Sequence, residues 1–264
     1  DVAFRKMEGK GFFTKELQDA LLENRVDLVV HSLKDLPTEE PKGLQVIAIP
    51  ERGNPADLLL ARRGLLEPDH AHPFGLPAGA VLGTSSLRRA AQALASSPGI
   101  EVRALRGNVP TRVRKLREGD YDAILLAAAG VERLGLEIDC LDCVGLAPEV
   151  MLPAPGQGAL AVETRAGDAT ATQISSLHDA AVGRCVNAER RLLDLLGGGC
   201  HLPLGCLATE DETGLRLQAV LGEIDDEVTR ATVSRVGSLA QNPESAACVC
   251  FEALRLAMPE VVRA

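Results

Sequence analysis

An acid and a base stand side by side shortly after the first apolar run of the sequence ends. The run Leu28-Val-Val-His predicts a buried strand, and Lys34 and Asp35 follow it within a few residues. Ligands of open α/β sheets bind beyond the carboxyl ends of the strands, so both side chains are expected at a cleft. A carboxylate there could move a proton or balance a positive charge. The alternative interpretation is a surface ion pair in a turn.

Cations follow the later predicted strands in the same way. Ser85 and Ser86 stand at the predicted start of a helix that continues with Arg88 and Arg89, and helix N-terminal N–H groups together with arginines attract anions. Three more arginines come after later predicted strands: Arg106, Arg112 and Arg133. Residues 84–115 hold six arginines, one lysine and one acid, a local net charge of +6 in a chain of net charge −9. This concentration favours an anion-binding cleft over a solvated basic face.

A cysteine follows three glycines in the stretch Gly197-Gly-Gly-Cys-His. The thiol of Cys200 stands on conformationally free backbone and could act as a nucleophile in its thiolate form. The alternative is a glycine helix cap followed by an incidental cysteine. Cys206 lies close behind it, and His201 is too near to be an obvious base. From spacing alone, the sequence therefore predicts an anion-binding α/β protein with a thiol that is a candidate nucleophile.

Composition excludes several other functions. A net charge of −9 and 2% aromatic residues argue against a nucleic-acid binder with a basic face or a base-stacking platform. No apolar run has the length of about 20 residues that a membrane span needs, and the opening residues do not resemble a signal peptide. Seven cysteines without regular four-ligand spacing predict reduced thiols in the cytoplasm and no metal site.

The elements that must position these residues alternate as strands and helices. Strict alternation over 81–134 predicts a mainly parallel sheet, which a helix over 15–22 and strands over 28–31 and 44–49 precede. Turn residues predict hinges at 51–56 and 150–156. The rest of the chain predicts a third, α+β unit, with helices near 174–181, 183–196 and 244–257 and a strand over 216–221.

Six motifs, taken together and in this order, resemble the porphobilinogen deaminase family, also called hydroxymethylbilane synthases. The motifs are Gly9-Lys-Gly-Phe-Phe-Thr-Lys-Glu-Leu, Asp27-Leu-Val-Val-His-Ser-Leu-Lys-Asp-Leu-Pro, Gly83-Thr-Ser-Ser-Leu-Arg-Arg, Arg106-Gly-Asn-Val-Pro-Thr-Arg, Pro155-Gly-Gln-Gly-Ala-Leu-Ala-Val-Glu and Gly197-Gly-Gly-Cys-His-Leu-Pro-Leu-Gly. The resemblance runs nearly from end to end of the chain. It implies a transferase of haem and chlorophyll biosynthesis that joins four porphobilinogen molecules into hydroxymethylbilane and releases ammonia at each addition.

The resemblance also implies roles for individual residues. A dipyrromethane cofactor would be held by a thioether to Cys200 and prime the chain, and Asp35 would be the catalytic acid. Residues that match cofactor-binding positions are Lys34, Ser86, Arg88 and Arg89. Residues that match substrate-binding positions are Arg106, Arg112, Arg133 and Lys10. Each porphobilinogen brings two carboxylates, so an arginine cluster would offset the charge of the growing product.

The expected fold class is α/β, with two domains like those of periplasmic binding proteins, hinge crossings between them and a smaller α+β C-terminal domain. The expected bounds are 1–51 with 157–176, then 56–150, then 180–264. The family carries a further segment before Gly9, so the first domain is expected to be incomplete at its N-terminal side. The expected protein is a cytoplasmic monomer with a small-molecule substrate and neither nucleic-acid nor membrane partners. The alternative hypothesis is a non-catalytic, two-lobed anion-binding protein or effector domain.

Overall fold

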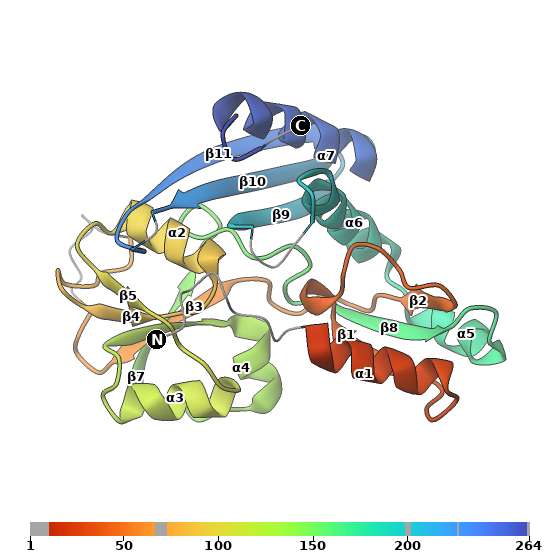
Figure 1. The fold of residues 1–264 in the computed structure, drawn as a ribbon, viewed down its shortest axis with the longest axis horizontal. Coiled ribbons are helices and arrows are strands. Elements are labelled where there is room, and N and C mark those ends of the chain that lie inside the picture. Colours follow the sequence, from red (N-terminus) through yellow and green to blue (C-terminus); the bar gives the residue numbers. More distant parts are fainter. Residues whose placement is uncertain (1–10, 67–72, 199–201, 226, 263–264) are drawn as a thin grey trace.

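The computed structural model describes residues 11–66, 73–198, 202–225 and 227–262. Within these residues the chain is a mixed α/β structure built around three separate β-sheets, as the sequence predicts (Figure 1). None of the helices in the described residues is long and apolar enough to span a membrane.

The first sheet combines strands from two distant parts of the sequence. Its strands are β1 (Val29–Ser32), β8 (Leu160–Arg165) and β2 (Leu44–Ala48), in that order, with every pairing antiparallel. The helical segments beside it are α1 (Gly11–Leu22), the 3-10 turns η2 (Leu33–Asp35) and η3 (Ser175–Leu177), and α5 (Ala169–Ile174). Leu21 of α1 packs against Val29 and Leu44, which anchors that helix to the sheet. Because β8 returns here after the whole second sheet, the chain crosses between the two sheets twice.

The second sheet carries the arginine-rich stretch. Its strand order is β5 (Glu101–Arg103), β4 (Val81–Gly83), β6 (Ala123–Ala127), β3 (Asp57–Arg62) and β7 (Leu141–Leu146). Its helices are α2 (Leu87–Ser96), α3 (Val109–Arg117) and α4 (Ala128–Leu134). Buried apolar side chains, many of them leucines, cover both faces of the sheet in two separate clusters. Asn108 caps α3 as the sequence predicts, because its side chain accepts a 2.9 Å hydrogen bond from the backbone N–H of Thr111.

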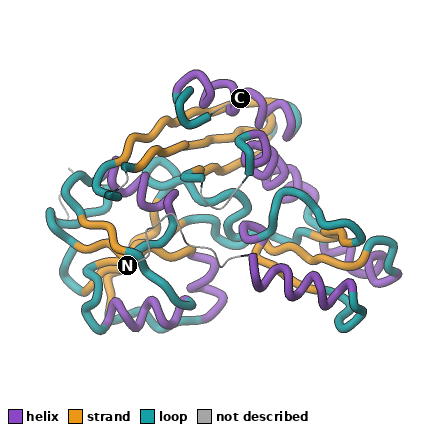
Figure 2. The backbone as a smooth tube through the Cα atoms, viewed as in Figure 1, coloured by secondary structure: helices purple, strands orange, loops and turns teal. Residues whose placement is uncertain are grey.

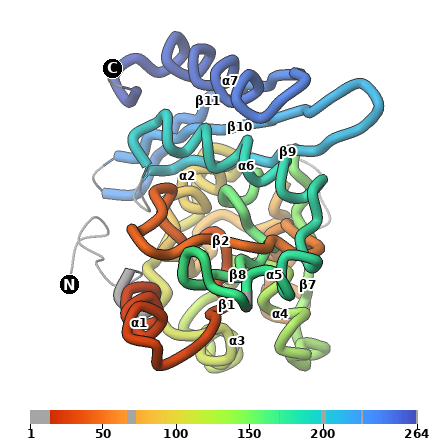
Figure 3. Tube along the Cα trace, turned by 90° about the vertical axis from the view of Figure 1, so that its right-hand side faces the viewer, coloured from red at the N-terminus to blue at the C-terminus, as the bar shows by residue number. Residues whose placement is uncertain are grey.

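The third sheet is antiparallel and lies above the other two in Figure 1. Its order is β11 (Ala231–Ala240), β10 (Gly214–Ile224) and β9 (Leu204–Asp211), and its helices are α6 (Ala180–Leu195) and α7 (Pro243–Ala257). Alternate residues of β10, such as Leu215 and Leu217, enter a buried cluster with both helices. Figure 3 shows α7 lying over β10 and β11 on this face, and helix α2 of the second sheet also contacts β10 and β11.

Two loop segments, 49–56 and 147–159, join the first sheet to the second; Figure 2 draws loops in teal. The backbone N–H of Gly53 donates a 3.2 Å hydrogen bond to the carbonyl of Gly158. Gly158 has a φ of +86°, and a Cβ there would lie 2.5 Å from the carbonyl oxygen of Gly53. The close approach of these crossings therefore requires glycine.

Two predictions about secondary structure were wrong. The second sheet is not mainly parallel: β4 pairs parallel with β5 and β6, but β3 pairs antiparallel with β6 and β7. The strand β3 enters directly from the first crossing, and the sequence pattern gave no sign that it lies between β6 and β7. The expected helix over 174–181 is interrupted, because the Asp179 side chain accepts hydrogen bonds from Ala181 and Val182 and caps α6.

Candidate active site

The Lys34–Asp35 pair lies on a short, firmly anchored turn. Strand β1 ends at Ser32, and the turn η2 continues as Leu33–Asp35. Leu33 and Leu36 are buried on both sides of the pair, whereas Lys34 and Asp35 are only half-buried. The apolar side chains fix the turn and leave the two charged groups accessible, as a reacting acid requires.

A second aspartate is the centre of a buried ion cluster. Asp57, which begins β3, is fully buried and accepts hydrogen bonds from Arg88 at 2.6 and 3.2 Å and from Arg89 at 2.7 and 3.0 Å. Both arginines come from the first turn of α2. They also bind backbone carbonyls: Arg88 that of Leu152, at 2.7 Å, and Arg89 that of Leu125, at 3.0 Å. The sequence predicted that these arginines belong to an anion site, and in the structure their two buried guanidinium groups surround one carboxylate.

Charge in this cluster is not balanced. Burial alone would raise the pKa of Asp57, but the charges of Arg88 and Arg89 outweigh it and hold this pKa well below its usual range. One carboxylate thus meets two guanidinium groups. The Nε of Arg88 is buried and finds no hydrogen-bond partner among the residues that the structure describes. The cluster therefore keeps a surplus positive charge, which suits an anionic ligand.

Lys34 connects the two aspartates electrostatically. Burial, together with the charge of Arg89, lowers the pKa of Lys34 to about 7, and Asp35 and Asp57 only partly oppose this. Its ammonium group donates a 3.4 Å hydrogen bond to Oε1 of Gln157. Burial is the main cause of this low pKa and the charge of Arg89 the second, and a carboxylate bound nearby would offset the charge of Arg89.

The remaining predicted arginines are more exposed. Arg112 is half-buried, and its charge reaches Arg89, which places it at the edge of the buried cluster. Burial lowers its pKa, and its Nε donates a 2.7 Å hydrogen bond to the carbonyl of Gly107.

Arg106 is exposed in the loop before α3. Arg133 is exposed as well, and donates a 2.7 Å hydrogen bond to the carbonyl of Gly158 at the crossing. Ser86 is the residue before α2 and is half-buried.

Sequence reasoning missed two residues that hold this site together. Gln157 is buried at the second crossing, and its Nε2 donates hydrogen bonds to the Asp57 carboxylate at 2.9 Å and to the carbonyl of Pro55 at 2.8 Å. Since its Oε1 faces Lys34, the orientation of this amide is fixed on both sides. Asp57 was the other omission. A lone carboxylate before the apolar run Leu58–Ala61, with two adjacent arginines downstream, was the available signal.

A further buried ion pair joins the crossings to the third sheet. Arg52 donates hydrogen bonds to both carboxylate oxygens of Glu189, at 2.7 and 3.0 Å, and Glu189 also accepts from the backbone N–H groups of Gly156 and Ala208. Glu189 is fully buried in α6. Every oxygen of this carboxylate is therefore engaged in holding the fold, and the pair is no free catalytic group.

Two predicted site residues, Cys200 and Lys10, lie outside the described residues. Helix α6 ends at Leu195, and Gly197, with a φ of +86°, turns the chain out of the helix just before the cysteine, as the glycine run predicts. Burial, with the nearby Glu189 carboxylate, raises the pKa of the Cys206 thiol well above its ordinary value, so Cys206 is inert. No group of His, Cys, Asp and Glu in the described part of the chain is arranged to hold a metal ion.

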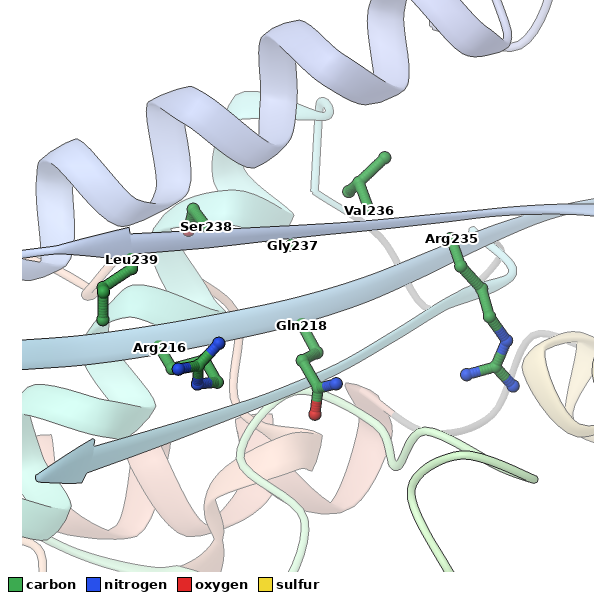
Figure 4. A pocket seen from close by; sticks show the side chains of 7 residues that line it. All are labelled: Arg216, Gln218, Arg235, Val236, Gly237, Ser238 and Leu239. Carbon is green, nitrogen blue, oxygen red and sulfur yellow. The ribbon is translucent and has the colours of Figure 1, made fainter.

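A hollow of about 490 Å³ lies on the third sheet (Figure 4). Arg216, Gln218 and Arg235 project toward it from β10 and β11, and Arg235 also donates hydrogen bonds to the carbonyls of Pro148 and Val150. Its lining includes neither a carboxylate nor a thiol. The hollow therefore lacks the groups for acid–base or nucleophilic chemistry, and the candidate active site remains the Asp35 turn with the Asp57 cluster.

Two family models match the chain. "Porphobilinogen deaminase, dipyromethane cofactor binding domain" matches residues 1–173, and "Porphobilinogen deaminase, C-terminal domain" matches residues 183–253. The chain is 46% identical over 226 residues to a porphobilinogen deaminase of Oceanobacillus iheyensis, covering 85% of this chain and 71% of that protein. It is 44% identical over 246 residues to a porphobilinogen deaminase of Thiobacillus denitrificans, covering 93% of this chain and 77% of that protein.

Solved structures give a weaker likeness. An ancestral cationic amino acid solute-binding protein is 16% identical, with a TM-score of 0.41 over 62% of this chain and 66% of that one. A periplasmic binding protein from Brucella ovis with glutathione bound is 18% identical, with a TM-score of 0.40 over 68% of this chain and 52% of that one. Likeness at this level carries no conclusion about what this chain does.

Proposed function

The chain belongs to the porphobilinogen deaminase family, and from that premise we propose that Asp35 is the acid at which its reaction takes place. The reaction is a transfer in tetrapyrrole biosynthesis: four porphobilinogen molecules condense into the linear hydroxymethylbilane, and each addition releases ammonia. The observation that carries the proposal is the position of Asp35, half-buried on a rigid turn beside Lys34 and close to a cluster with surplus positive charge. The family match does not favour a non-catalytic anion-binding protein.

The described residues fit the dipyrromethane cofactor of this family. The cofactor carries several carboxylates, and the site offers more cations than carboxylates around Asp57 and Lys34. We propose that Lys34, Ser86, Arg88 and Arg89 hold these carboxylates and that Cys200 forms the thioether. When bound, the group supplies the covalent primer from which the product is built.

We propose a separate role for each kind of side chain during one addition. The substrate loses ammonia when its aminomethyl C–N bond breaks, and the ring becomes electron-poor. Asp35 can donate or accept a proton at this nitrogen and can stabilise the positive charge that develops. The substrate's carboxylates would be bound by Arg106, Arg112, Arg133 and Lys10. This binding aligns the substrate and lowers the entropic cost of reaching the transition state.

We also propose three domains with the bounds 1–51 with 157–176, 56–150 and 180–264, and a monomeric protein in the cytoplasm. The three sheets support this division, because the first one contains strands from both sides of the second. The site is built from elements of one chain, which supports a monomer. Free cysteines in the described residues support a reducing compartment.

Intact-mass spectrometry of the purified protein tests the attachment. We expect a covalent adduct of two pyrrole units in the native protein and its loss in Cys200→Ser. The matched control is Cys185→Ser, which removes a half-buried thiol of α6 and should keep the adduct. An unmodified mass in protein that produces hydroxymethylbilane would refute the proposal.

A further inference from the structure

One face of helix α6 lies along the segment that carries Asp35. Val186, Arg190 and Asp194 are spaced four residues apart, so they share this face of the helix. Val186 is buried in a cluster with Leu33 and Leu36, the two apolar anchors of the turn. Asp194 accepts a 3.4 Å hydrogen bond from the hydroxyl of Thr38. The helix that leads to Cys200 therefore packs against the whole stretch 33–38.

Arg190 makes the polar contacts in the middle of this face. Its Nη1 donates hydrogen bonds to the carbonyls of Leu33 at 3.5 Å and Leu36 at 3.2 Å, and its Nη2 donates to that of Pro37 at 2.5 Å. The carbonyl of Leu33 also accepts the hydrogen bond that closes the turn, from the backbone N–H of Leu36 at 3.2 Å. One planar guanidinium group thus joins carbonyls before and after Asp35, which a single ammonium could not match in geometry.

We propose that Arg190 is a positioning residue for Asp35: it fixes the backbone of residues 33–37 so that the Asp35 carboxylate is held at the reaction site. This inference rests on the proposed function of Asp35. The hydrogen bonds of Arg190 described above all go to main-chain carbonyls, so its effect on Asp35 is expected to pass through the turn. Misplacing a reacting group by about 1 Å can reduce a rate by about 10²-fold. Loss of the hydrogen bonds from Arg190 should therefore lower kcat.

Three variants of the adduct-bearing protein test the proposal. Arg190→Ala should lower kcat about 10²-fold while the KM for porphobilinogen stays within about twofold and the adduct mass is unchanged. Arg190→Lys keeps the charge but loses the planar guanidinium with its two donor groups. Its kcat should therefore lie between those of Arg190→Ala and wild type. The matched control is Arg191→Ala, because Arg191 follows on the same helix but pairs with Glu244 and Asp194 instead. Its kcat should stay near wild type.

Hydrogen–deuterium exchange gives a readout that does not depend on activity. Amides of residues 33–37 should exchange faster in both Arg190 variants and at the wild-type rate in Arg191→Ala. If Arg190→Ala does not fold, Arg190→Lys alone must still show the lower kcat and the faster exchange.

Wild-type kcat in folded Arg190 variants, or unchanged exchange over 33–37, would overturn the inference, as would a rise in KM alone. A fully active Asp35→Asn would instead refute the proposed function of Asp35, without changing any effect of the Arg190 variants on hydrogen exchange. Refutation of the role of Asp35 can therefore be distinguished from refutation of the role of Arg190.

Discussion

Two aspartates close to Lys34 have opposite surroundings. Asp57 is fully buried, and its carboxylate accepts hydrogen bonds from two arginines and from Gln157. Asp35 is half-buried, on a turn whose fixed parts are its neighbours Leu33 and Leu36. The same type of side chain is thus a structural counter-charge at one position and an accessible acid at the other.

The difference teaches that burial, more than proximity to cations, separates the two roles, because Asp57 is fully buried and Asp35 is half-buried. A carboxylate that binds several donors in a dry cluster has no capacity left for a substrate, and its removal leaves buried cations without compensation. An accessible carboxylate can be changed at little cost to the fold. Asp57 should therefore control stability, and Asp35 should control turnover.

The largest expected effect is that of Asp35→Asn on turnover. The amide keeps the shape of the side chain but can neither carry a proton nor offset positive charge, so kcat should fall by about 10²–10⁴-fold. Steady-state assays of hydroxymethylbilane formation measure it. Glu39→Gln, at an exposed carboxylate just after the turn, is the control and should retain full turnover. Substantial activity in Asp35→Asn would show that the acid lies elsewhere.

The next effect is that of Asp57→Asn on stability. Removing one partner of a buried ion cluster leaves uncompensated charge, so the free energy of unfolding should fall by about 3–5 kcal/mol. Chemical denaturation measures this, and Asp35→Asn in the same experiment should lose less than about 1 kcal/mol. Equal losses for the two variants would break the comparison between the aspartates.

Lys34 should make stability depend on pH. In the unfolded chain a lysine keeps its proton up to about pH 10.4, whereas in the fold the pKa of Lys34 is about 7. Between these values the unfolded state binds more protons, so this group's destabilising effect is complete below pH 7 and is relieved as pH rises. The stability of wild type should therefore rise by at most about 1.4 kcal/mol per pH unit more than that of Lys34→Met.

Denaturation curves at pH 7, 8 and 9 measure this slope. Lys42→Met, at an exposed lysine, is the control and should keep the wild-type slope. Identical slopes in Lys34→Met and wild type would mean that burial and Arg89 do not lower the pKa of Lys34 in the folded protein.

The smallest effect is expected at an arginine outside the buried cluster. Arg106 is exposed, so Arg106→Ala should change the free energy of unfolding by about 0.5 kcal/mol or less. A screened contact with a substrate carboxylate is worth up to about 1 kcal/mol, so KM should rise by up to about fivefold. Arg114→Ala, at an exposed arginine that pairs with Glu118, should leave KM unchanged. A stability loss as large as that of Asp57→Asn would refute the contrast.

The sequence predicted the elements that local patterns define. The cap at Asn108, the glycine end of α6 and the strand before Lys34 all follow from neighbouring residues, and the structure confirms them. The motif resemblance correctly predicted the family. Roles assigned to single residues by that resemblance, such as Asp35 as the acid, stay predictions.

Long-range pairings could not be predicted from these patterns. Whether β3 pairs parallel or antiparallel depends on strands that lie far away in the sequence, and its apolar run Leu58–Ala61 suits either. The partners of Arg88 and Arg89 were missed for the same reason: the sequence shows two cations at a helix start but not the aspartate 31 residues earlier that faces them.

The two loop crossings have a mechanical consequence. Side chains bind much of their backbone: Arg52 binds the carbonyl of Gln157, Arg133 that of Gly158, and Gln157 that of Pro55. In the part of the chain that the structure describes, the first two sheets share no strand. A few side chains therefore determine how rigidly the two loop segments connect the sheets. Single substitutions at these side chains should change the flexibility of the connection while both sheets keep their strand pairing.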